Sequence, residues 1–178
     1  MSKRSFPLSK VYGLLEPGPV LLLTTAHKGR DNVMPMSWHT MMEFEPPLVG
    51  CVVSDKDFSF AALKATRQCV LNIPTVELAS QLVACGNTSG QCLDKFKAFG
   101  LTAEPAERVD APLISECYAN LECQVLDTRL VNNYNFFVLE VLKAWIDPTR
   151  KDVRTLHHRG RGVFMVAGET IKLSSKMK

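Results

Sequence analysis

The chain has 178 residues, of which 46% are apolar and 22% charged, and its formal net charge is +3. This composition is ordinary for a globular protein with a substantial core, so we expect one domain over residues 1–178, with its core at about 15–168. The positive charge is small and scattered, which argues against a nucleic-acid partner. No apolar run approaches the roughly 18 residues that span a bilayer, and no apolar stretch of a signal peptide follows the charged N-terminus. We therefore expect a cytoplasmic protein without a membrane partner.

Cysteine spacing limits the metal and redox chemistry of the chain. No two cysteines form a Cys-x-x-Cys pair, so neither a zinc knuckle nor a thioredoxin-type couple is indicated. Most lie in apolar strings such as VGCVV and QCVLN, and free cysteine is among the most buried residue types. We expect buried, inert thiols; the two that flank the polar segment GNTSGQ, at 85 and 92, fit this expectation least. The six are Cys51, Cys69, Cys85, Cys92, Cys117 and Cys123.

The first third of the chain predicts three strands in succession. Residues 20–25 are apolar and partly β-branched, and the six residues that follow contain Gly29 and suit a hairpin connection. Residues 33–40 return as the second strand. Residues 47–54 form the third, and the Pro-Pro pair stands at its start, where a missing backbone donor does least harm.

Short helices and further strands follow. A helix is expected from Ser59, capped by Asp57 or by Ser59 itself, and a strand at 69–73. A second helix starts at Pro74-Thr75 and ends at Gly86, and a turn or two over 93–99 stops at Gly100. Residues 102–112 are polar and predict a loop. The remaining strands are expected at 117–127, at 135–146 and near 163–167.

Many strands with a few short helices between them favour a mainly β barrel decorated by helices. A doubly wound parallel sheet would need regular alternation of strand and helix, which the C-terminal half lacks. Within this barrel, the stretch from Asn32 to Ser54 presents Ser37, Trp38 and Thr40 beside a Pro-Pro corner. That arrangement suits a flat polar ligand, and it points to chemistry done by a bound cofactor rather than by side chains.

Four potential donors suit a phosphate monoester, namely Asn32, Trp38, Ser59 and Lys95. Such a group prefers a hydroxyl, an amide, a helix N-terminus and one or two cations. Each of these residues also has a purely structural interpretation. Ser59 could cap its helix, Lys95 could be a solvated lysine, and Trp38 could be a partly buried packing residue that forms a wall. Neither GxGxxG nor a P-loop is present, so the usual nucleotide motifs do not help.

The segment HHRGR from His157 is a second polar cluster. Adjacent histidines point to different faces of a strand, so they do not indicate a shared metal, and we expect no metal site. The cluster is either an ordinary basic loop or a place where Arg159 or Arg161 meets an acidic group of a ligand. His39 should face away from Trp38 on a strand, as a core or interface histidine.

The order and spacing of several motifs resemble the flavin reductase-like, FMN-binding split-barrel family, and within it the flavoredoxin-type proteins. The resemblance spans roughly residues 15–168. Its motifs are the stretch from Asn32 to Ser54, FSFAAL from Phe58 with VLN from Val70, SG from Ser89 with DKF from Asp94, and APLISEC from Ala111 with LEC from Leu121.

The resemblance implies a homodimer of Greek-key split β-barrels with FMN held near the subunit interface. It implies that Asn32, Trp38, Ser59 and Lys95 hold the phosphate; family members often carry Thr where this chain has Ser59. It also implies that two segments line the isoalloxazine and the ribityl chain of FMN. These are the strand of Met36, Ser37, Trp38, His39 and Thr40, and the strand end of Ser54, Asp55 and Lys56.

The function implied is an FMN-binding oxidoreductase that passes hydride or electrons between NADH or NADPH and flavin. If the HHRGR cluster is functional, Arg159 or Arg161 is expected to meet the acidic part of the nicotinamide cofactor or of FMN, from the partner subunit. The cofactor does the hard chemistry at its N5, so no catalytic side chain is needed. One alternative is a flavoredoxin-type electron carrier with tightly bound FMN and a protein redox partner. A second is a non-catalytic split-barrel module, which could also hold haem or another flat cofactor.

Overall fold

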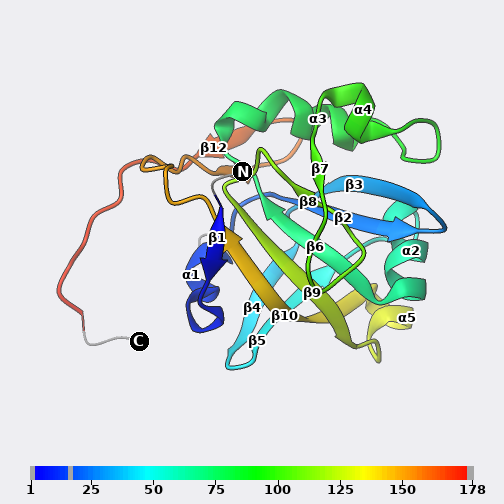
Figure 1. The fold of residues 1–178 in the computed structure, drawn as a ribbon, viewed down its shortest axis with the longest axis horizontal. Helices are drawn as coiled ribbons and strands as arrows, with labels where there is room; N and C mark the ends of the chain where they lie inside the picture. Colours follow the sequence, from blue (N-terminus) through cyan, green and yellow to red (C-terminus); the bar gives the residue numbers. More distant parts are fainter. Residues whose placement is uncertain (1–2, 16–17, 176–178) are drawn as a thin grey trace.

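The computed structural model describes residues 3–15 and 18–175. Its main element is an eight-stranded antiparallel sheet that curls into a barrel, with strand order β3-β2-β6-β9-β10-β5-β4 and β1 paired to β10 (Figure 1). Two short pairs, β7–β8 and β11–β12, lie outside it. The strands are β1 Arg4–Phe6, β2 Leu21–His27, β3 Arg30–Met36, β4 His39–Phe44, β5 Pro47–Val52, β6 Gln68–Ile73, β7 Ala103–Glu104, β8 Leu113–Ile114, β9 Ala119–Asp127, β10 Phe136–Ile146, β11 Leu156–His158 and β12 Phe164–Val166.

The barrel is split between β3 and β4. These two strands follow one another in the sequence, yet they stand at opposite ends of the strand order. β3 pairs with β2 up to Leu21↔Met36, whereas β4 pairs with β5 from His39↔Cys51. The prediction of a mainly β barrel with a few short helices is confirmed.

Both faces of β2 are covered, which explains its continuous apolar run. Leu21 and Leu23 face the barrel interior, where they meet Leu121 and Leu139 from strands β9 and β10. Leu22 faces outward into a second cluster beneath the helices. Alternating side chains of one strand thus enter two cores, because successive residues point to opposite faces.

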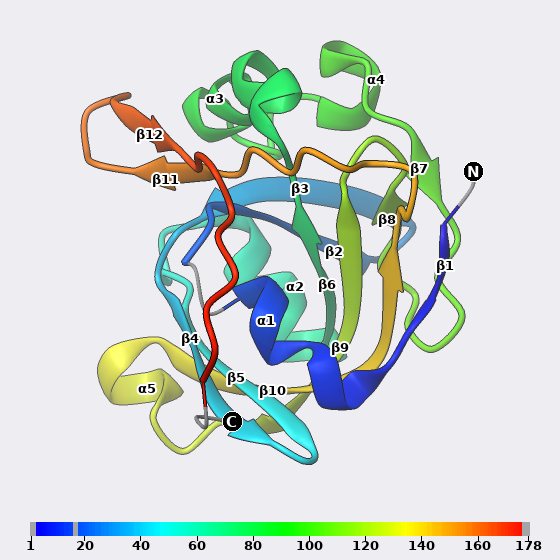
Figure 2. The ribbon, with the colours of Figure 1, turned by 90° about the vertical axis from the view of Figure 1, so that its left-hand side faces the viewer.

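Short helices close the barrel and cover its outside. η1 and α1 lie across one end of the barrel (Figure 2), where Val11 and Leu15 join the core. α3 and α4 pack along the outer side of β3. The predicted stop at Gly100 is confirmed, since that residue ends α4 with φ +66°. The helices are η1 Leu8–Lys10, α1 Tyr12–Leu15, α2 Phe58–Thr66, η2 Val76–Leu78, α3 Ala79–Asn87, α4 Lys95–Phe99 and α5 Val131–Tyr134.

The first hairpin is as expected, but the continuous strand over 33–40 is wrong. Lys28 and Gly29 both take positive φ in the tight turn between β2 and β3. β3 then ends at Met36, and Ser37 and Trp38 stand between it and β4. The chain must leave β2 here and join β5, and the Trp38 carbonyl already accepts from the Val52 N–H at 3.0 Å. The exchange of partner strands breaks the ladder.

The prediction that Gly86 ends the second helix is also wrong. The helical segment begins as η2, passes into α3 and continues to Asn87, so Gly86 lies within its last turn. A Cβ at this position would lie 3.0 Å from Pro35 Cγ. The glycine therefore allows α3 to approach β3 closely rather than stopping the helix.

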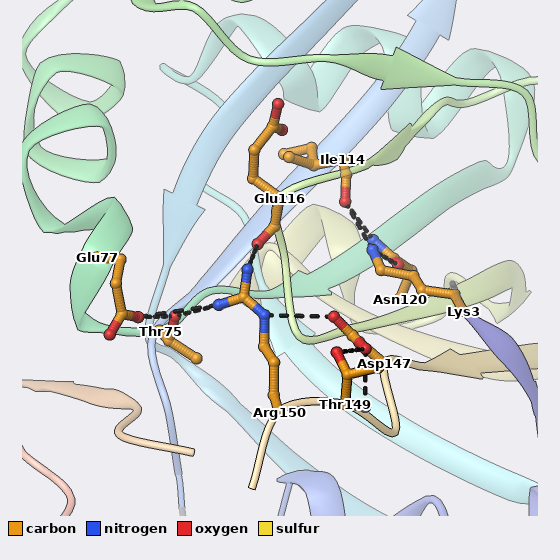
Figure 3. A network of polar contacts seen from close by, with 9 residues as sticks. All are labelled: Lys3, Thr75, Glu77, Ile114, Glu116, Asn120, Asp147, Thr149 and Arg150. Atoms are coloured by element: carbon orange, nitrogen blue, oxygen red, sulfur yellow. Dashed lines mark hydrogen bonds and ion pairs between the residues drawn. The ribbon is translucent and has the colours of Figure 1, made fainter. Parts of the chain in front are cut away.

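A strap of residues 147–155 carries the chain from β10 to β11 across the barrel end. The Arg150 guanidinium donates to Thr75 Oγ1 and to the Glu116 carbonyl, each at 3.0 Å, and lies 3.5 Å from Asp147 (Figure 3). The Val76 N–H donates to the Arg154 carbonyl at 2.8 Å. These contacts hold the β11–β12 hairpin beside α3.

Strand β1 and helices η1, α1 and α5 were not expected from the sequence. The predicted burial of the cysteines is confirmed at five positions, and Cys92 is exposed. Burial raises the pKa of Cys85 to about 11, in keeping with an inert thiol. Within residues 3–15 and 18–175, no helix has the length and apolar character to cross a membrane.

Candidate functional site

Asn32, Ser59 and Lys95 come together around one cavity of about 250 Å³, here called the Asn32 cavity. Asn32 is on β3, Ser59 is the second residue of α2, and Lys95 is the first residue of α4. The loop of residues 88–90 forms another wall. Arg30 holds the continuation of this loop by donating to the carbonyls of Gln91 and Leu93 at 3.4 and 3.5 Å.

Asn32 is buried with one polar atom unpartnered. Its Nδ2 donates to Ser59 Oγ at 2.7 Å, whereas Oδ1 has no hydrogen-bond partner among the described residues. The side chain is only 4% exposed. The nitrogen and oxygen of an amide are exchanged by a flip, after which Ser59 would donate to Oδ1 and the NH₂ group would be the free one. Either way, a buried polar atom is left for a ligand.

Ser59 was expected either to cap its helix or to meet a ligand. The N-cap position of α2 is Asp57, whose side chain makes no capping hydrogen bond, and Ser59 is buried against Asn32. Because Asp57, Phe58 and Ser59 all line the Asn32 cavity, the N-terminus of α2 opens onto it. The partial positive charge there favours an anion.

Lys95 is a buried cation, and the alternative of a solvated lysine is wrong. It is 4% exposed, and its Nζ donates to the Val33 carbonyl at 2.9 Å and to the Cys85 carbonyl at 2.7 Å. Burial lowers the pKa of Lys95, and the nearby Cys85 and Asp57 oppose that shift. An ammonium has three donors, and in the described part of the chain only two acceptors are recorded for this one. One donor is thus available to a ligand in the cavity.

Gly90 brings bare backbone against Asn32. A Cβ on Gly90 would overlap Asn32 Oδ1 and lie 2.9 Å from Phe58 Cδ1. Only glycine therefore leaves this wall of the Asn32 cavity in place. The resemblance had drawn attention to the Ser89-Gly90 dipeptide, but neither residue was proposed as a contact.

Trp38 is separated from the other three donors. It is 71% exposed, so it is not the partly buried wall considered above, and it lines a neighbouring depression of about 220 Å³, here called the Trp38 groove. Met36, Ser37 and Ser54 also line this groove. Lys56 lines the Asn32 cavity instead. The groove and the cavity adjoin, because Met34, Pro35 and Asp57 belong to both.

A third hollow of about 280 Å³, here called the His158 cavity, is lined by residues of β3, of α3 and of the β11–β12 hairpin, and it shares Gly86 and Asn87 with the Asn32 cavity. Pro35 lines all three hollows, and Met36 and Ser37 line both the Trp38 groove and the His158 cavity. The His158 ring contacts the Phe164 ring at a centroid distance of 5.2 Å, with the two ring planes tilted by 43°. The adjacent His157 contacts Thr155 Oγ1 at 3.1 Å instead, so the two rings have separate surroundings, as expected.

The remaining predicted residues are not among those that line these hollows. Thr40 and Asp55 are exposed, as are Arg159 and Arg161, and none of them lines the three hollows. His39 is half-buried, and its Nε2 lies 2.7 Å from the Pro19 carbonyl while Nδ1 has no partner in residues 3–15 and 18–175. Burial lowers the pKa of His39.

Sequence reasoning missed Pro35, Asn87 and Gly90 as wall residues, and it considered His158 only in a basic loop. Only the family motif at Ser89-Gly90 could have indicated from the sequence that Gly90 lines the site. No group of three or more His, Cys, Asp or Glu side chains is arranged to hold a metal within the described ranges.

Comparison with known proteins decides the family. The model of the flavin reductase like domain matches residues 14–164, which is most of the chain. The chain belongs to the flavin reductase like domain family. The uncharacterized protein YddH of Escherichia coli is 30% identical over 172 residues, which cover 89% of this chain and 91% of that protein.

Solved structures agree with this family fold. A crystal structure of an FMN-binding domain of a flavin reductases-like enzyme from Shewanella baltica has a TM-score of 0.90 and 25% identity, covering 97% of both chains. The flavoredoxin of Desulfovibrio vulgaris (Miyazaki F) has a TM-score of 0.80 and 21% identity, covering 89% of this chain and 91% of that one. The family's FMN-binding split-barrel fold, expected from the motifs, is therefore the fold of this chain.

Proposed function

We propose that this chain binds FMN with its phosphate in the Asn32 cavity and acts as an FMN-dependent oxidoreductase. The observation that carries the proposal is the buried Lys95 ammonium, which has a donor to spare beside an unpartnered polar atom of Asn32. A phosphate would supply the missing acceptors for a cation, an amide and a hydroxyl together. The structurally similar Shewanella protein is itself described as FMN-binding, which supports the same cofactor here.

The residues around the cavity fit a phosphate rather than a neutral group. The N-terminus of α2 adds partial positive charge, and Gly90 leaves room that a side chain would fill. Lys56 adds a second cation at the wall. A carboxylate does line the cavity at Asp57, but the two lysines outnumber it.

For the rest of the cofactor we propose the adjoining Trp38 groove. Met36, Ser37, Trp38 and Ser54 would contact the ribityl chain and the isoalloxazine, with His39, Thr40 and Asp55 further out. The continuity of the hollows around Pro35 supports an elongated ligand. Trp38 would then contact the ring end of FMN and not the phosphate.

When bound, FMN would supply hydride or electron transfer at its N5. The side chains named here bind and orient it, and we assign none of them a catalytic role. NADH or NADPH is the proposed electron donor. Arg159 and Arg161, exposed on the turn after β11, are proposed contacts for its phosphates or for FMN of a second subunit.

A second copy of the chain is the proposed partner. Trp38, Met42 and Phe44 are exposed by 71%, 49% and 47% along β4 and the residue before it. Apolar side chains gathered on a barrel edge are typical of an interface. Analytical ultracentrifugation should show a dimer, and Met42→Asp should weaken it, whereas Leu130→Asp, at another exposed apolar position, should not. A monomer at micromolar concentration would contradict the proposal.

We propose as a second candidate function an electron carrier with a protein redox partner, which the similar fold of the flavoredoxin of Desulfovibrio vulgaris supports. The two are separated by anaerobic kinetics of the FMN-loaded protein. Prompt reduction by NADH or NADPH, with turnover of free flavin, supports the reductase. A flavin that resists both nucleotides but accepts electrons from a reduced redox protein supports the carrier. A protein that stays colourless and does not bind added FMN would overturn both and leave the non-catalytic module.

A further inference from the structure

A separate cavity of about 320 Å³ lies on the side of the barrel formed by β1, β7, β8 and β10. It shares no lining residue with the Asn32 cavity, the Trp38 groove or the His158 cavity, as far as the described residues go. Its volume is within the range of small-molecule sites. The walls are Lys3, Glu104, Pro105, Glu107, Leu113 and Trp145.

The back of this cavity is held rigidly by Glu122, a fully buried carboxylate on β9. Glu122 accepts hydrogen bonds from the backbone N–H groups of Glu107 and Arg108 and from Trp145 Nε1, the last at 2.7 Å. The loop that follows β7 and the Trp145 indole of β10 are therefore held in place by the same carboxylate. The cavity is formed before any ligand enters it, which lowers the entropy cost of binding.

The Lys3 amine reaches into the barrel end from the residue before β1. Its Nζ donates to the Ile114 carbonyl at 3.0 Å and to Asn120 Oδ1 at 2.5 Å (Figure 3). A neutral amine has two N–H bonds, which these two acceptors satisfy, and it keeps a lone pair. Burial lowers the pKa of Lys3 to about 8, against opposing effects of Cys117, Glu104 and Asp147. The neutral, nucleophilic form of Lys3 is therefore far more populated near neutral pH than that of a lysine with the usual pKa.

We propose that Lys3 is a covalent site for small uncharged aldehydes, which bind in this cavity as imines. The Lys3 nitrogen lone pair forms a bond to the aldehyde carbon. The carbonyl oxygen leaves as water with the two protons of the amine, and a C=N bond replaces C=O. The step involves no oxidant or reductant, and hydrolysis reverses it.

The surroundings of Lys3 suit the product as well as the reactant. Protonation from solvent turns the imine into an iminium cation, and the Glu104 carboxylate at the cavity wall is available as its counterion. Glu107 is paired with Lys143 at 2.5 Å, and that lysine also lies over the Trp145 ring. The two carboxylates disfavour an anionic ligand. Trp145, Leu113 and Pro105 give the organic part of an aldehyde apolar contacts.

The hydrogen bonds of Lys3 survive the reaction in part. An iminium keeps one N–H, which can remain on Asn120 Oδ1. The Ile114 carbonyl also accepts from Asn120 Nδ2 at 3.0 Å, so it retains a donor when the lysine gives one up. Imine formation therefore leaves neither Asn120 Oδ1 nor the Ile114 carbonyl without a hydrogen-bond donor. A buried acceptor without a donor would have opposed the reaction.

The test is reductive trapping of the full chain. The protein is incubated with benzaldehyde and cyanoborohydride at pH 7.4, and tandem mass spectrometry locates each adduct. We expect the rate at Lys3 to exceed that at exposed lysines such as Lys10 by about tenfold or more, since an ordinary lysine is about 0.1% neutral at this pH. The rate at Lys3 should saturate with benzaldehyde concentration, as binding requires, while Lys10 should respond linearly.

Two cavity-filling variants decide whether the cavity matters. Leu113→Phe fills the buried side and Pro105→Trp the exposed rim, so at least one should fold. In either, the rate at Lys3 should fall severalfold and lose its saturation, while Ala103→Trp, at an exposed position outside the cavity, should change neither. The proposal is overturned if Lys3 reacts no faster than Lys10, if its rate is linear in benzaldehyde, or if a folded cavity-filling variant reacts like the parent chain.

Discussion

Replacing Lys95 with methionine should separate FMN from riboflavin. Methionine keeps the length and apolar bulk of the lysine stem and removes the ammonium that lies between the Val33 and Cys85 carbonyls. A hydrogen bond to a charged group contributes about 1.5–3 kcal/mol, which is about a 10- to 150-fold change in a dissociation constant. Only FMN carries the phosphate. We therefore expect Kd for FMN to rise by that factor and Kd for riboflavin to change by less than about threefold.

The same change should also destabilise the protein without ligand. The Cys85 carbonyl belongs to the last turn of α3, where carbonyls lack partners within the helix, and Lys95 supplies one. An acceptor left unsatisfied costs about 1–3 kcal/mol, so Tm should fall by about 3–8 °C. Lys97→Met is the matched control, because Lys97 is exposed on the same helix and should alter neither Tm nor affinity.

Fluorescence titration of the flavin-free protein measures both dissociation constants, and calorimetry measures Tm. The pH dependence adds a second test. Burial lowers the pKa of Lys95, so the free protein loses this cation as the pH rises through that lowered value. FMN affinity should therefore decrease on the alkaline side while riboflavin affinity does not. Equal losses for the two flavins in Lys95→Met, in folded protein, would refute the assignment of Lys95 to the phosphate.

Three further outcomes are expected. Gly90→Ala places a methyl group against Asn32 Oδ1 and should reduce FMN affinity at least about tenfold. The control is Gly168→Ala, whose methyl group meets no atom within 4 Å and should leave FMN affinity unchanged in the same titration. If Gly90→Ala also left FMN affinity unchanged, the 88–90 loop would not be part of the site. Trp38→Phe should change Kd for FMN and Kd for riboflavin by the same factor, because Trp38 lines the groove proposed for the ring end of the flavin. A change confined to FMN would instead mean that Trp38 contacts the phosphate. Burial lowers the pKa of His39, so its contribution to stability is fully present above pH 6.5, the usual value, and is lost as the pH falls toward the lowered one. His39→Gln keeps a donor for Pro19, and its Tm should fall less than that of the parent chain between pH 6.5 and 5; parallel curves would contradict this.

The regular elements were largely predictable because their signals are local. The apolar, β-branched run at residues 20–25 and the stop at Gly100 are signals from residues close in sequence. The break at Ser37–Trp38 was not predictable from such signals, since it arises where β4 takes β5 as its partner. Gly86 was misread for a similar reason. Its role is set by Pro35, about fifty residues earlier in the sequence.

The candidate site was predictable as a set of residue types and less so as a geometry. The order of the motifs pointed to Asn32, Ser59 and Lys95, which line one cavity. It could not show that Lys95 is buried on two backbone carbonyls, because both come from elements folded against α4. It also grouped Trp38 with them, although the strand break turns that indole into the adjoining groove.

The most direct measurement is a crystal structure of the protein with FMN bound. We expect the phosphate in the Asn32 cavity, with one of its oxygens within about 3.2 Å of Lys95 Nζ and others bonded to Asn32 and Ser59. A phosphate outside this cavity, with Lys95 still bonded only to the Val33 and Cys85 carbonyls, would contradict the account.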